Sequence, residues 1–76
     1  MAGPIRELDR RSNGEAHVSL LWREGDDRLF VAVVDGRQGE VFRLEVREGE
    51  RPLDVFHHPY AYAAWHGVQP GSAVAT

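Results

Sequence analysis

Residues 16–47 read AHVSLLWREGDDRLFVAVVDGRQGEVFRLEVR, and this stretch decides the fold. It divides into three apolar-rich runs, at 16–23, 28–35 and 40–47, which are separated by the loops EGDD and GRQG. Turns prefer glycine and aspartate, whereas runs rich in Val, Leu and Phe favour strands. The stretch therefore predicts an antiparallel three-stranded meander, in which Arg23 faces Arg28 and Asp35 faces Glu40.

This register sorts the side chains into two faces, because successive residues of a strand point to opposite sides. One face is apolar at every position, and a slip of one residue in either hairpin would scatter it. We name it the inner face and expect it to form the core. Its members are Val18, Leu20, Trp22, Leu29, Val31, Val33, Phe42, Leu44 and Val46.

The opposite side, the outer face, is more apolar at its centre than a solvated face requires. Its apolar members are Leu21, Phe30, Ala32, Val34 and Val41. Either the N-terminal segment folds back over them or a second molecule covers them. We favour a homodimer joined through these side chains.

The structure of the N-terminal segment is left open, with residues 5–11 forming either a strand or a helix. Ser12-Asn13-Gly14-Glu15 carries a hairpin turn signal, so residues near 6–11 are candidates for a fourth, edge strand. Arg6, Arg10 and Arg11 suit an exposed edge that resists indiscriminate pairing.

A C-terminal helix is predicted over residues 52–66, since Pro52 suits a first turn and Gly67 a left-handed cap. Pro59 interrupts it, leaving either one bent helix or two short ones. We favour one bent helix with Pro59 on the solvated side, because the apolar stripe keeps its phase through the proline. The stripe, expected to cover the inner face, is Leu53, Phe56, Tyr60, Ala63 and Ala64.

The fold expected is a single α+β domain over residues 1–67. It is an antiparallel three-stranded meander, with an optional fourth N-terminal edge strand, covered on one face by one kinked C-terminal helix. Residues 68–76 are expected to be a flexible tail. A chain of 76 residues supports one small core, and the absence of cysteine removes disulfides and thiolate metal sites.

The segment HHPYAYAAWH, residues 57–66, concentrates histidine and aromatic side chains. Within and just before it lies a row of neighbours four residues apart on a helix: Asp54, His58, Tyr62 and His66. This polar row is either a ligand-binding or enzymatic site, in which Asp54 orients the His58 imidazole, or a solvated helix face. We favour the solvated face, because Pro59 falls between Asp54 and His58.

The spacing of the candidate side chains argues against metal binding and nucleophilic catalysis within one chain. Adjacent His57 and His58 point about 100° apart on a helix, and His58 and His66 lie about 12 Å apart. Only a zinc site assembled across a dimer stays open. Ser19 lies on the sheet face opposite the helix, so no triad assembles. We therefore predict no catalytic residues, no metal and no cofactor, and favour a non-enzymatic role.

The charge balance also bears on partners. A net charge of −3 argues against nucleic acid as the main partner. No apolar run has the length of a signal peptide or a membrane span, so we expect a cytoplasmic protein.

The function expected is an interaction or regulatory module that self-associates through the outer face. Ligand binding or catalysis at the polar row is the alternative, and weak nucleic-acid binding through Arg43 and Arg47 comes third.

The segments LLW, DGRQGEVFRLEV and LDVFHHPYAYAA together resemble those of a group of small actinobacterial proteins of unknown function. The resemblance covers residues 6–66. It agrees with the residue usage, since all nine basic residues are arginine, as a GC-rich genome favours. It implies no activity and assigns no role to a residue.

Overall fold

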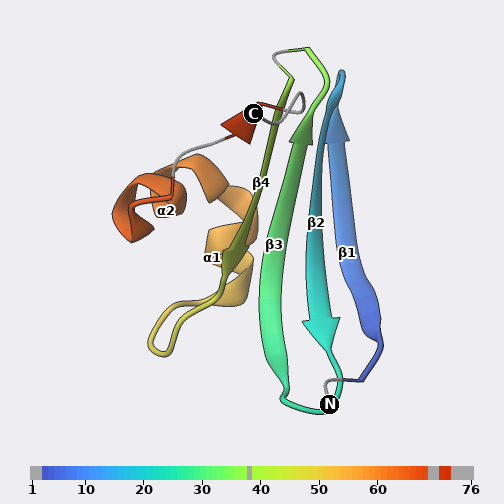
Figure 1. Ribbon diagram of the computed structural model, residues 1–76, viewed down its shortest axis with the longest axis vertical. Coiled ribbons are helices and arrows are strands. Elements are labelled where there is room, and N and C mark those ends of the chain that lie inside the picture. The colour runs from blue at the N-terminus through green and yellow to red at the C-terminus, as the bar shows by residue number, and fades with distance from the viewer. Residues whose placement is uncertain (1–2, 38, 69–70, 73–76) are drawn as a thin grey trace.

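The computed structural model describes residues 3–37, 39–68 and 71–72 of the chain. One antiparallel sheet has the strand order β1-β2-β3-β4-β5, and two helices lie together on one side of it (Figure 1). The α+β class is confirmed. The elements are β1 (Ile5–Asn13), β2 (Ala16–Arg23), β3 (Arg28–Asp35), β4 (Glu40–Glu45), α1 (Pro52–His57), α2 (Pro59–His66) and the two-residue β5 (Gly71–Ser72).

The register of the central strands is the predicted one. Arg23 lies opposite Arg28, and Asp35 lies opposite Glu40, so both four-residue loops have the expected length. Two rows run straight across the inner face, Val18 to Val33 to Phe42 and Leu20 to Val31 to Leu44.

The core forms where this face meets the helices. Val31 and Val55 have no solvent exposure, and Leu44 and Val33 have 1% each. Burying a side chain of this size stabilises the fold by roughly 1.5–3 kcal/mol. The core cluster is Val18, Leu20, Val31, Val33, Phe42, Leu44, Val55, Phe56 and Ala63.

The predicted fourth, N-terminal edge strand is confirmed and is β1. It pairs antiparallel with β2 through a two-residue turn, in which Gly14 takes a φ of 65° that glycine adopts without strain. A bulge at Leu8 shifts its register, a common device on exposed edges. The strand extends the sheet sideways, so the described N-terminal residues do not fold back over the outer face.

Arg11 has a different role from the one expected. Its guanidinium donates from Nε and Nη2 to the Phe56 carbonyl, at 3.1 and 2.9 Å, and from Nη2 to the His57 carbonyl at 3.3 Å. The same group lies 5.4 Å from the centre of the Phe56 ring. Arg11 therefore binds the carboxyl end of α1, where a positive charge is favoured, instead of guarding an exposed edge.

The single bent helix is wrong: the chain forms two helices that meet at His58. His58 has φ −131° and ψ 53°, outside the helical region, and Pro59 begins α2 as its first residue. A proline disfavours helical geometry at the residue before it, so the chain breaks there instead of bending. Pro59 is buried, not solvated.

The apolar stripe is correct in only part of its length. Phe56 and Ala63 are buried as expected, but Leu53 is 57% exposed, Tyr60 is 45% exposed and Ala64 is exposed. Val55 takes the buried position in α1 that the stripe gave to Leu53. Because the chain breaks at His58, each helix is oriented independently of the other. The buried positions of the two helices therefore need not follow one helical period.

The chain after α2 returns towards the sheet. Gly67 caps α2 with a φ of 73°, and the Val68 N–H donates to the Ala63 carbonyl at 2.8 Å. Gly71 and Ser72 pair with Val41 and Glu40 at the edge of β4. The remaining residues of the expected tail, 69–70 and 73–76, lie outside the described residues, and its flexibility stays a prediction.

Replacing Val55 with alanine tests which face of α1 is buried. Val55→Ala should lower the free energy of unfolding by about 2 kcal/mol, because it leaves a cavity in the core. Leu53→Ala, the matched control, should change it by less than about 0.5 kcal/mol. Urea denaturation followed by tryptophan fluorescence measures both, and the reverse ranking would contradict the assigned helix phase.

Replacing Arg11 with methionine tests its contact with α1 while keeping its apolar stem. Arg11→Met should cost about 1–3 kcal/mol of unfolding free energy, since two carbonyls lose a charged donor. Arg10→Met, at an exposed position beside it, should stay within about 0.5 kcal/mol of the parent chain. Equal losses for the two variants in urea denaturation would show that Arg11 does not hold α1.

Candidate functional site

The polar row is assembled only in part. The Tyr62 hydroxyl, on α2, donates a hydrogen bond to the Asp54 carboxylate on α1. This bond, together with partial burial and the negative charge of Asp54, raises the pKa of Tyr62 above its usual value. The Tyr62 ring meets the His66 ring edge-on at 6.2 Å. Tyr62 thus joins the two helices.

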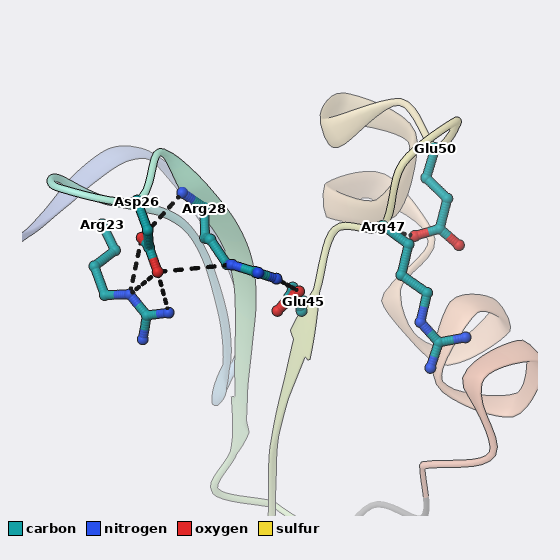
Figure 2. Close-up of polar contacts among 6 residues, drawn as sticks. All are labelled: Arg23, Asp26, Arg28, Glu45, Arg47 and Glu50. Carbon is teal, nitrogen blue, oxygen red and sulfur yellow. Dashed lines mark hydrogen bonds and ion pairs between the residues drawn. The ribbon is translucent and has the colours of Figure 1, made fainter. Parts of the chain in front are cut away.

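His66 binds a partner that helical spacing did not reveal. Its side chain is 2% exposed, and its Nε2 lies 2.7 Å from Oε2 of Glu50, which precedes α1. Glu50 also accepts a hydrogen bond of 2.8 Å from the backbone N–H of Arg47, drawn in Figure 2. The carboxylate therefore links the C-terminal end of α2 to the connection between β4 and α1.

The pKa of Glu50 reflects two opposing influences. Partial burial acts to raise it, but the hydrogen bonds from His66 and from the Arg47 backbone, with the charges of both residues, outweigh burial. The pKa of Glu50 is therefore held below its usual value. An ionised Glu50 stabilises the folded chain.

His58 is separated from the rest of the row. It lies at the break between the helices with an exposed side chain, and its backbone N–H donates to the Asp54 carbonyl at 2.9 Å. Within the described residues its imidazole forms no hydrogen bond or ion pair. Asp54 is engaged by Tyr62 and does not orient His58, so the hypothesised catalytic pairing is not formed.

A groove lies beside His58, between the helix break and the sheet. It encloses about 380 Å³ and is open to solvent. Val18 and Val33 contribute its apolar lining from the strands, and Arg11, His57 and His58 contribute its polar lining. A second depression, of about 560 Å³ and also open to solvent, runs along α1 and is lined by residues that include Leu53, Asp54, His57 and His58.

The side chains of the described residues contain no group of three or more His, Cys, Asp or Glu that is placed to hold a metal ion.

The outer face has a buried centre and an exposed end. Phe30 is only 7% exposed, because the guanidinium groups of Arg23 and Arg43 lie 4.9 and 5.2 Å from its ring centre. Val34 and Val41 lie opposite each other and are 46% and 42% exposed. Phe30 is therefore largely covered by arginine side chains of its own chain, and its contact with a partner stays a prediction.

Four charged side chains form a chain of ion pairs at the other end of this face (Figure 2). Arg23 donates to Asp26 at 2.7 Å, and Arg28 bridges Asp26 at 3.6 Å and Glu45 at 2.5 Å. The hydrogen bond from Arg23, aided by the backbone N–H of Arg28, lowers the pKa of Asp26 against the opposing effect of desolvation. Two positive and two negative groups balance, so this end carries little net charge.

No protein-family model, curated protein or solved structure matches the chain. The resemblance to small actinobacterial proteins therefore stays a prediction. Within residues 3–37, 39–68 and 71–72, neither helix has the length and apolar character needed to cross a membrane.

Replacing Glu50 with glutamine should weaken the dependence of stability on pH. Because the pKa of Glu50 is lower in the folded chain, its ionised form stabilises the fold above the unfolded value, near 4.3, and this contribution is lost as the pH falls through the folded value. Urea unfolding at pH values from neutral into the acid range should give a smaller slope for Glu50→Gln than for the parent chain. Glu48→Gln, at an exposed position, is the control, and a slope unchanged in Glu50→Gln would refute the assignment.

Proposed function

We propose that the protein is a non-catalytic interaction module that self-associates through the outer face of its sheet. The observation that carries this proposal is the placement of β1. It lies alongside β2 in the same sheet, so no described segment covers the apolar residues of the outer face. The covering segment was the rival explanation for that patch, and the described chain does not supply it.

The chemistry of the patch suits a protein partner. Val34 and Val41 form a cross-strand apolar pair that is almost half exposed, next to the partly exposed Ala32. Leu21, also partly exposed, lies opposite Phe30 further along the same face. Arg43 lies directly opposite Ala32 and flattens the surface by stacking on Phe30. Apolar side chains bordered by arginine are the composition favoured at the centre of protein interfaces.

The size of the face also supports a second copy as the partner. Strands of eight residues, spaced about 4.8 Å apart, give the four-strand face an area of roughly 500 Å². Two such faces bury about 1,000 Å², close to the lower limit of a specific interface. In a twofold pair the same surface meets itself, and the balanced ion pairs at one end add little repulsion.

The polar row supports a non-catalytic role. Asp54 and Tyr62 bind each other, and His66 binds Glu50, so three of its four members are engaged within the fold. Groups held in this way stabilise the helix pair, and they are not free to exchange protons with a substrate.

Introducing charge into the valine pair tests the proposal. The parent chain should sediment above its monomer mass of 8.6 kDa as concentration rises, whereas the double variant Val34→Glu/Val41→Glu should remain a folded monomer. Both side chains are partly exposed, so the fold should tolerate the change better than a substitution of Phe30. Sedimentation equilibrium with circular dichroism measures mass and folding together.

Two control variants locate the interface. Leu53→Glu changes an equally exposed aliphatic residue on α1, and Trp65→Ala removes the 81% exposed tryptophan of α2. Both should associate like the parent chain. A parent chain that is monomeric at every concentration, or a dimer lost only in Trp65→Ala, would overturn the proposal.

A further inference from the structure

The groove beside His58 combines an apolar floor with a cationic wall. Val18 and Val33 line it from the sheet, and Pro59 and Tyr60 line it from α2. Arg11 reaches it from β1, and His57 and His58 lie at the junction of the helices. Its volume of about 380 Å³ falls within the range of sites for small organic ligands.

Arg11 is the formally charged side chain among the described residues that line this groove, and its charge is opposite to the net charge of the chain. The protein has 12 acidic residues and a net charge of −3, yet no Asp or Glu is among the described residues that line the groove. The neighbouring carboxylates lie at its borders. Glu40 accepts a hydrogen bond of 3.3 Å from the Tyr60 hydroxyl, and Glu15 and Asp35 line the adjoining depression beyond Asn13.

Donors are present on the cationic wall. Arg11 uses Nε and Nη2 to hold α1, but Nη1 has no acceptor among the described residues. The exposed imidazoles of His57 and His58 likewise form no hydrogen bond within the described chain. A carboxylate accepts hydrogen bonds from such nitrogens, and those from a guanidinium are strengthened by its charge.

We propose that this groove binds a small amphipathic anion, in which a carboxylate is attached to a short apolar body. The carboxylate lies against Arg11, His57 and His58. The apolar body lies against the ring of Tyr60, which is 45% exposed, and against the exposed side chain of Ala61, and this contact removes apolar surface from water. The site is on the helix side of the sheet and is independent of self-association through the outer face.

Hydrocinnamate is a suitable probe, and its neutral amide, hydrocinnamamide, is the matched control ligand. Amide proton–nitrogen correlation spectra of the full chain should show saturable shifts on adding hydrocinnamate, centred on Arg11 and residues 57–61. Hydrocinnamamide should bind more weakly, because it carries no charge for the cationic wall to attract.

Introducing a negative charge at each exposed histidine tests the wall. His57→Glu and His58→Glu should each weaken hydrocinnamate binding by about tenfold, which corresponds to about 1.4 kcal/mol. His17→Glu is the matched control, since His17 lies on the outer face beside Ser12, and its affinity should equal that of the parent chain. The dispersion of the spectra verifies that each variant is folded.

Several results would overturn the proposal. They are the absence of saturable shifts, equal binding of the amide, affinities unchanged in both groove variants, or shifts centred instead on Tyr62 and Trp65 of α2. A monomeric chain that still binds hydrocinnamate would reject self-association and leave this site standing.

Discussion

Two four-residue loops fix the strand register, and the rest of the structure depends on that register. They place Arg23 against Arg28 and Asp35 against Glu40, which brings the six strand residues of the core cluster to one side: Val18, Leu20, Val31, Val33, Phe42 and Leu44. A change of one residue in either loop would turn a whole strand over, because the side-chain period of a strand is two. The inner face is therefore a continuous apolar surface, and the helices pack on it.

The helices need that surface because neither is long enough to be stable alone. α1 has six residues and α2 has eight, well below the length at which isolated helices persist in water. Val55, Phe56 and Ala63 anchor them in the core, and polar contacts fix their ends. Two members of the polar row add to these contacts: Tyr62 binds Asp54 of α1, and His66 binds Glu50, which precedes α1.

The sheet was predictable from the sequence, and the helix pair only in outline. Alternation of apolar residues is a local signal, so it specified the strands, their faces and their partners. The role of Arg11 depends on a contact with Phe56, 45 residues away, and no local pattern reports it. The stacking of Arg23 and Arg43 on Phe30 likewise follows from the assembled sheet.

The incorrect predictions in the helical region come from treating residues 52–66 as one continuous helix. Because proline disfavours helical geometry at the preceding residue, the position of the interruption was predicted correctly. The prediction of a single helix came from the apolar stripe, whose spacing continues across Pro59. Pro59 is buried because α2 packs as a separate element, with its own orientation.

The carboxylate of Glu50 lies outside either helix, so helical spacing could not connect it to His66. Whether the outer face and the polar row act as the sequence suggested stays a prediction.

The exposure of β1 has a consequence for how the molecule opens. All of its residues except Arg11 are exposed, so this strand is retained mainly by its backbone ladder to β2. Segments with so few buried contacts exchange their amide hydrogens through local openings, below the free energy of global unfolding. When β1 detaches, Arg11 leaves the carboxyl end of α1 as well, so fraying at one margin of the sheet also loosens the helix that packs on β2 and β3.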